Sequence, residues 1–205
     1  MAKDGKEDEV TVFVDFFPNL IRNGRTKDVE NILEQTFKKD LPEKIARYGK
    51  LPYLMIQLGP FNSYLQEARK LYVDEYYRAA VALCGMTVEA LCLEIARERV
   101  PDYDPLKTHL VDPSNNCRKK IDYLKKHLRI PKSASLLHQV LDIRIKYLHI
   151  QTAHVLPEEV LGCINILHLA VIAEYGLMTA EEGKVRPSSE EDVDQLARDM
   201  KLEVK

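Results

Sequence analysis

The stretch EYYRAAVALCGMTVEALCLEIARERV, residues 75 to 100, decides the fold. It carries no charged residue between Arg78 and Glu89, and Pro101 follows it as a helix stop. In a globular protein, a helix that is apolar nearly all round is surrounded by other helices. The sequence therefore predicts a helix over residues 75–98 at the middle of a helical bundle, as its most buried member.

Small residues form one face of this predicted helix. Ala82 and Gly85 lie between Arg78 and Glu89 and would let a second helix come close. Glu89 would then face a packed neighbour, and a buried carboxylate generally needs a partner. We therefore expect Glu89 to be paired.

The chain on both sides of this stretch shows the same helical character. Apolar residues make up 45% of the chain and charged residues 30%, with eight glycines, which is the balance of a mostly helical globular protein. Asp74 is a suitable N-cap for the central helix, and residues 101–116 are rich in Pro, Asp and Asn, as loops are. Periodicity, prolines and glycines predict the other core helices over residues 60–73, 117–128, 133–154 and 157–175, with Gly176 as the last C-cap. The expected fold is an all-α bundle of four to five core helices.

The first 59 residues are expected to form a helical extension of this bundle. Residues 10–17, VTVFVDFF, suit either a short strand or the start of a helix. Thr26 is a good N-cap for a helix of about three turns, and Pro42 suits the first turn of a second, short helix ending near Gly49. The apolar face of the first helix comprises Val29, Ile32, Leu33, Thr36 and Phe37. We therefore divide the chain into an extension (1–59), a bundle (60–180) and a polar C-terminal tail (181–205).

Composition also narrows the classes of protein. No stretch approaches the ~18 uninterrupted apolar residues of a membrane-spanning helix, and the acidic start MAKDGKEDE has no character of a targeting peptide. We expect a cytoplasmic protein without membrane contact. The four cysteines show no metal-binding spacing, so we expect them to be reduced and mostly buried, and we expect neither a metal nor a cofactor. His109, His127, His138, His154 and His168 are dispersed, and most should lie at the surface or in loops.

Basic residues concentrate in one part of the chain. Residues 117–149 contain nine Lys and Arg against two Asp, a net charge of +7 in a chain whose total is −2. This asymmetry favours RNA as a ligand, although a solvated helix face would show the same pattern. The candidate RNA-binding residues are Arg118, Lys119, Lys120, Lys125, Lys126, Arg129 and Lys146.

Arg144 and His149 are the candidate catalytic pair. Arg144 shares a helical face with Leu137, Leu141 and Leu148, whereas His149 lies about 140° away at about 100° per residue. The two would converge on one substrate if the helix ends or distorts there, or if a second copy of the chain supplies the complementary groups. In the structural alternative, Arg144 bonds Glu89 inside the bundle and His149 caps the helix C-terminus.

These residues resemble a known family. A long helix containing VEALCLEIA, a basic helix, a helix ending R-I-K-Y-L-H and a helix beginning P-E-E are together similar to the HEPN superfamily, particularly to its uncharacterised members. The resemblance covers roughly residues 60–178. It departs from the family pattern at Ile145, where a polar residue usually follows the Arg.

The resemblance implies a metal-independent endoribonuclease that acts as a homodimer in defence or stress response. Arg144 and His149 from both copies would line one cleft, with Glu89 and Tyr147 as supporting residues. His149 would act as general base or acid, and Arg144 would stabilise the phosphorane. The rival function, which Ile145 favours, is a non-catalytic module that binds RNA or a protein partner, the latter through the N-terminal extension.

Overall fold

The computed structural model describes residues 24–52, 59–100, 117–128, 131–149, 154–178, 185–186 and 189–200. It divides the chain into two compact units, Met1–Ala46 and Arg47–Lys205. This division falls earlier than the predicted boundary after residue 59. The interpretations of residues 10–17 and 101–116 lie outside the described residues.

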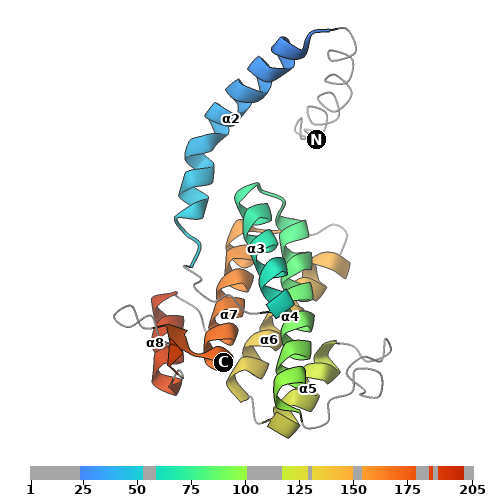
Figure 1. Ribbon diagram of the computed structural model, residues 1–205, viewed down its shortest axis with the longest axis vertical. Coiled ribbons are helices and arrows are strands. Elements are labelled where there is room, and N and C mark those ends of the chain that lie inside the picture. The colour runs from blue at the N-terminus through green and yellow to red at the C-terminus, as the bar shows by residue number, and fades with distance from the viewer. Residues whose placement is uncertain are drawn as a thin grey trace. The chain divides into compact units, whose positions relative to one another are not determined.

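The second unit is a helical bundle (Figure 1). Its helices are α3 (Gly59–Val73), α4 (Tyr77–Arg99), α5 (Cys117–Leu128), α6 (Pro131–His149), α7 (Pro157–Tyr175) and α8 (Glu190–Asp199). Five of them form the predicted core of the all-α fold, which is confirmed. The ranges predicted for α3, α5 and α7 agree with the structure, because prolines and glycines mark their ends.

Side-chain bonds give the directions of the helices. Lys146 Nζ donates to Glu159 Oε1 over 2.7 Å near one end of the α6–α7 pair, and Ser133 bonds Glu174 near the other end, so α6 and α7 are antiparallel. Arg118 of α5 likewise bonds Asp142 of α6. Because α3 and α4 are joined by a short turn and pack on each other, they also run in opposite directions.

Helix α4 lies at the middle of the bundle, as predicted, since it packs on α3, α5, α6 and α7. Ten of its 23 residues are buried. The prediction that it is the most buried helix is wrong, because eleven of the 19 residues of α7 are buried. The run Cys163–Ile172 is buried without interruption, since α3, α4, α6 and α8 all pack on α7.

The start of α4 differs from the prediction. The helix begins at Tyr77 rather than at residue 75, and Tyr76 rather than Asp74 occupies its N-cap, without a side-chain cap bond. Glu75 adopts a left-handed backbone conformation with φ of 66°. Its carboxylate accepts a 2.6 Å bond from Arg47 Nη1, and Arg47 Nε donates to the carbonyl of Val73. This turn ends α3 one residue before Asp74 and sets where α4 can begin.

The end of α6 differs as well. The predicted helix over residues 133–154 begins two residues earlier, at Pro131, and its helical run ends at His149. His154 has no helical conformation and is exposed. Pro131 suits the first position of a helix because that position needs no N–H donor.

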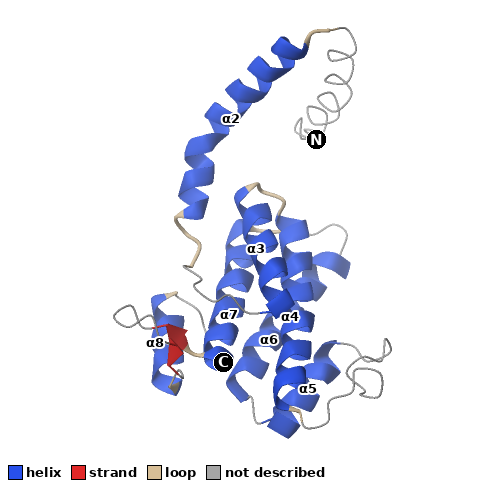
Figure 2. Cartoon of the chain, in the orientation of Figure 1, coloured by secondary structure: helices blue, strands red, loops and turns tan. Residues whose placement is uncertain are grey.

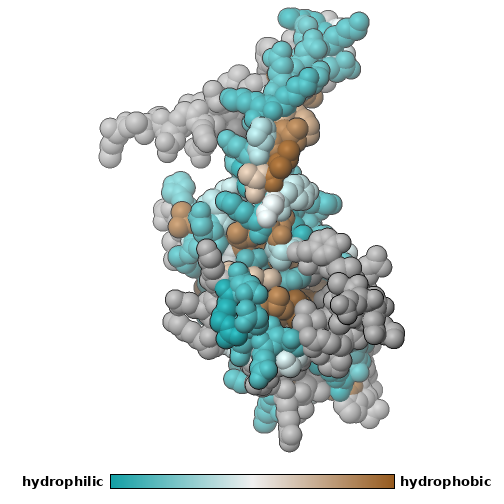
Figure 3. Space-filling model, turned by 90° about the vertical axis from the view of Figure 1, so that its left-hand side faces the viewer, coloured by the Kyte–Doolittle hydropathy of each residue, from teal (hydrophilic) through white to brown (hydrophobic). Residues whose placement is uncertain are grey.

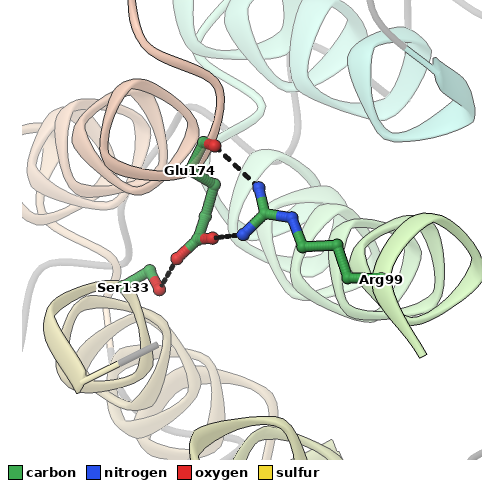
Figure 4. A network of polar contacts seen from close by, with 3 residues as sticks. All are labelled: Arg99, Ser133 and Glu174. Carbon is green, nitrogen blue, oxygen red and sulfur yellow. Dashed lines mark hydrogen bonds and ion pairs between the residues drawn. The ribbon is translucent and has the colours of Figure 1, made fainter. Parts of the chain in front are cut away.

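The buried carboxylate of Glu174 joins α4, α6 and α7 at the end of the bundle where α6 begins and α7 ends (Figure 4). The side chain of Glu174 is 6% exposed. It accepts a 2.5 Å bond from Arg99 Nη1 of α4 and a bond from the hydroxyl of Ser133 of α6. Arg99 Nη2 also donates to the Glu174 carbonyl over 2.7 Å. These bonds compensate for removing the carboxylate from water.

The C-terminal part of the bundle is more ordered than its polar composition suggests. Ser189 and Asp192 form a capping box at the start of α8, in which each side chain bonds the other residue's backbone N–H. Val193 and Ala197 are buried, and α8 packs on α7. The strands β1 (Leu177–Met178) and β2 (Val185–Arg186) form a short antiparallel pair, shown in red in Figure 2.

Helix α2 (Thr26–Tyr48) belongs largely to the first unit. The two predicted helices are wrong here, because one helix of 23 residues runs through Pro42. Thr26 is its first helical residue rather than its N-cap, since the carbonyl of Arg25 accepts the bond from the amide of Val29. Val29 is its one buried residue among those described.

An exposed apolar stripe runs along α2. Its members recur every three or four residues, and Figure 3 shows apolar side chains in brown on this helix. The stripe comprises Leu33, Phe37, Leu41, Ile45 and Tyr48, which are 37–61% exposed. An apolar helical face of this length usually marks a surface that another surface covers.

Among the described helices, α4 alone is long and apolar enough to cross a membrane. A core helix of a bundle passes the same test, and α4 packs on four neighbours. Its place in the bundle therefore accounts for its composition.

Candidate functional site

The candidate site begins where α6 crosses Gly85 of α4. A Cβ atom at this glycine would lie 2.1 Å from Arg144 Cδ and 2.5 Å from Arg144 Nε. The side chain of Arg144 therefore rests directly on the α4 backbone. The expectation that small residues of α4 admit another helix is confirmed, and the side chain that uses the space is that of the candidate catalytic arginine.

One hydrogen-bond donor of the Arg144 guanidinium is left without an acceptor. This donor, Nε, is buried and has no hydrogen-bond partner in the described part of the chain. No bond joins Arg144 to Glu89 among the described residues, so the structural alternative that pairs them is not observed. A buried donor without an acceptor costs free energy, and the cost is larger for a charged group. Arg144 Nε therefore retains hydrogen-bonding capacity that no described residue meets.

Glu89 lies on α4, four residues after the glycine that Arg144 contacts. It is half-buried, and its charge acts on the thiol of Cys117, where it opposes the charge of Arg144. Both charges therefore act on the Cys117 thiol, although no bond joins Glu89 to Arg144 among the described residues. The expectation that Glu89 is paired is not met within the described residues.

His149 is the last residue of α6, and its side chain lies outside the described residues. Because α6 is helical from Arg144 to His149, the backbone positions of the two residues lie about 140° apart around the helix axis. Tyr147 is 2% exposed and contributes to the core. Its ring lies 4.8 Å from Lys146 Nζ.

An open pocket of about 590 Å³ lies at the same end of the bundle. It is bounded by the start of α4, the last turn of α6 and the segment before α7, and its lining includes Tyr76, Tyr77, Arg78, Ala82, Leu148 and His154. Ala82 precedes Gly85 by three residues, and Leu148 follows Arg144 by four. The pocket and the contact between Arg144 and Gly85 therefore both lie along the interface of α4 and α6, about one helical turn apart.

The candidate RNA-binding residues divide into two groups. Arg118 bonds Asp142, and Lys146 bonds Glu159, so part of the basic charge is neutralised locally. The remaining described members lie on α5, where Lys119, Lys125 and Lys126 are exposed and Lys120 is half-buried. Arg129 lies outside the described residues. Lys125 and Lys126, both exposed, are the best candidates for contacts with phosphate.

His168 is an exception to the expectation that most histidines lie at the surface or in loops. It is 6% exposed on α7, and burial, together with the charge of Arg69, lowers its pKa to about 4. Its Nδ1 has no partner in the described residues. His154 is exposed, as expected, and His138 bonds Asp122 over 3.0 Å, whereas the side chains of His109 and His127 lie outside the described residues.

The cysteines are all free and buried, as predicted. Their spacing along the chain did not indicate that they lie in pairs between helices. A hydrogen bond to Cys117 and burial raise the pKa of the Cys92 thiol, and a bond to Cys84 and burial do the same for Cys163. No group of three or more Cys, His, Asp or Glu side chains within the described ranges could hold a metal ion.

Comparison of the chain with protein-family models, curated proteins and solved structures found no match.

Proposed function

We propose that this chain is a metal-independent endoribonuclease that acts as a cytoplasmic homodimer, with Arg144 and His149 of both copies in a composite site. The observation that carries the proposal is the buried Nε of Arg144, which has no partner in the described residues. A phosphate of RNA would supply two acceptor oxygens to the guanidinium fork. Lys125 and Lys126 of α5, both exposed, would hold the strand nearby.

In the proposed reaction, the substrate supplies its own nucleophile. His149 of one copy removes the proton from a ribose 2′-hydroxyl, and the 2′-oxygen forms a bond to phosphorus. The bond from phosphorus to the 5′-oxygen breaks, and His149 of the second copy donates a proton to that oxygen. Arg144 stabilises the charge on the phosphorane. The products are a 2′,3′-cyclic phosphate and a free 5′-hydroxyl.

A second copy is one way to bring both groups to a single phosphate. Five residues separate Arg144 and His149 on α6, so at about 100° per residue their positions lie about 140° apart around the helix axis. A second copy brings its own pair to the same substrate. The resemblance to HEPN proteins, and with it a role in defence or stress response, belongs to the same proposal.

Cleavage of a broad RNA pool tests the proposal. His149→Ala should lower the rate by about 10²–10⁴-fold while thermal stability and RNA affinity stay nearly unchanged, because the imidazole acts on protons. His138→Gln is the matched control, since His138 bonds Asp122 away from the proposed pair. EDTA should leave the rate unchanged. Cleavage that survives His149→Ala would refute the mechanism.

Arg144→Lys separates charge from geometry. Lysine keeps the positive charge but loses the planar fork and reaches a phosphate differently. We expect cleavage to fall strongly in Arg144→Lys as well as in Arg144→Ala. Mass spectrometry of the fragments should show the 2′,3′-cyclic phosphate, and a 3′-hydroxyl in its place would contradict the reaction.

A second candidate function is a non-catalytic module that binds a protein partner through the N-terminal extension. The observation that favours it is the exposed apolar stripe of α2. Ile145, 41% exposed beside Arg144, agrees with it as well. Sedimentation velocity on the full chain would show whether a second copy covers the stripe: Phe37→Glu should then dissociate the dimer, whereas Gln35→Glu on the far side of α2 should not. RNA that stays intact with the purified protein would favour this function over the first.

A further inference from the structure

The pocket at the start of α4 has two distinct parts. Its rim contains exposed groups that differ in chemistry, namely the ring of Tyr76, the guanidinium of Arg78 and the imidazole of His154. Its deeper wall is half-buried and mainly apolar, with Ala82 and Leu148. An apolar wall with a few polar groups at the opening is the usual construction of a small-molecule site, and about 590 Å³ lies within the usual range.

Tyr76 gives the rim an aromatic surface. It is 64% exposed, although its neighbour Tyr77 is half-buried and packs against Tyr72 with ring centroids 6.0 Å apart. Tyr77 therefore anchors the start of α4 in the core, while the ring of Tyr76 stays available at the pocket. An exposed aromatic ring beside a cavity is the surface on which nucleobases stack.

The position of the pocket relative to Arg144 indicates what fills it. Ala82 and Leu148 line the pocket, and Gly85 and Arg144 follow along the same interface about one helical turn away, or roughly 5 Å along the helices. A ligand that spans both places has a planar, largely apolar end and an anionic end. A nucleotide has this construction, with a base at one end and a phosphate at the other.

We propose that this pocket binds one nucleobase of single-stranded RNA, stacked on Tyr76, next to the phosphate that Arg144 holds. The identity of the polymer rests on the proposed function. The site would select which base lies beside the cleaved bond, because the polar groups of the rim meet the edge of the base. Paired bases in a duplex are not free to enter, so the pocket also favours single strands.

Binding of mononucleotides tests the pocket without any cleavage. The four ribonucleoside 3′-monophosphates are titrated into the full chain and followed by NMR or calorimetry. We expect at least one to bind, and Tyr76→Ala to weaken it by roughly 5- to 150-fold, the range found for loss of one base–aromatic stack. Tyr76→Phe should bind as the wild type does, because stacking uses the ring face. Tyr48→Ala, which removes another exposed tyrosine, is the matched control.

A second variant fills the pocket instead of removing the ring of Tyr76. Ala79 lines the pocket and is exposed, so Ala79→Trp should occupy the space without disturbing the core. It should abolish mononucleotide binding and, in the cleavage assay, raise KM while kcat changes little. Circular dichroism checks that each variant is folded.

The outcomes separate this inference from the proposed function. Binding that Tyr76→Ala and Ala79→Trp weaken, without any cleavage, would support the pocket and refute the nuclease. Cleavage with KM and base preference unchanged in both variants would refute the pocket and leave the nuclease. A wild-type chain that binds none of the four mononucleotides overturns the pocket.

Discussion

Replacing Gly85 by alanine tests directly whether the side chain of Arg144 packs on Gly85. In a helix interior, Gly→Ala ordinarily stabilises a protein by about 0.5–1 kcal/mol. Here the new Cβ would lie 2.1 Å from Arg144 Cδ, far inside the roughly 3.5–4.0 Å of a normal carbon contact. Displacing the arginine from a packed seam should cost about 1–3 kcal/mol. We therefore expect Gly85→Ala to destabilise the wild-type chain by about 0–2.5 kcal/mol.

Gly85→Ala should change the free energy of unfolding in the opposite direction once Arg144 is removed. In an Arg144→Ala background the three atoms nearest to the new methyl group are gone, so Gly85→Ala should stabilise by about 0.5–1 kcal/mol. Urea unfolding of the four proteins gives a coupling free energy, which we expect to be about 1–3 kcal/mol. Gly162→Ala on α7 is the control, because a Cβ there meets nothing within 4 Å.

Equal effects of Gly85→Ala in both backgrounds would refute this reasoning, because they would show that Arg144 does not rest on Gly85. The variant also bears on the proposed reaction. If Arg144 holds phosphate from its position on Gly85, Gly85→Ala should depress RNA cleavage by displacing Arg144, although it replaces none of the candidate catalytic residues.

Three further predictions concern the core, pH and RNA. Leu91→Ala should cost about 2–5 kcal/mol in urea unfolding because Leu91 is fully buried in α4, and a loss under ~1 kcal/mol would contradict that packing. The folded pKa of His168, about 4, lies below the ordinary 6.5, so stability should be fully present above pH 6.5 and fall by about 3 kcal/mol as the pH drops to 4, and His168→Gln should remove this slope. Lys125→Glu with Lys126→Glu should weaken RNA binding and reduce its salt slope by roughly 1–1.5, whereas Lys39→Glu on α2 should change neither.

Much of the bundle could be predicted because its helix ends carry local signals. Pro157 and Gly176 bound α7, and Gly59 begins α3. Where the signal was ambiguous, the prediction failed. Pro42 was expected to begin a helix, because an interior proline removes a backbone bond, yet α2 continues through it. The apolar pattern also does not rank two apolar helices by burial, because burial depends on how many neighbours cover each one.

The candidate site was predicted only in part. Small residues of α4 were expected to admit a neighbour, but the pattern did not identify Arg144 as the side chain that uses Gly85. The pocket depends on the turn at Glu75 and on a helix end before His154, and both are set by tertiary contacts. His168 was missed because its sequence neighbours do not show that α3 covers it with Arg69.

Glu174 joins segments that are far apart in the chain. It lies 75 residues after Arg99 and 41 residues after Ser133. The α3–α4 and α6–α7 pairs can form from contacts that are closer in sequence, and the bond from Ser133 lies within the second pair. The bond from Arg99 joins the two pairs and can form only after they have docked. We therefore expect the Arg99 bond to be absent from the folding transition state. Its contribution would then appear in the unfolding rate, so this bond would govern how long the folded bundle lasts rather than how fast it forms.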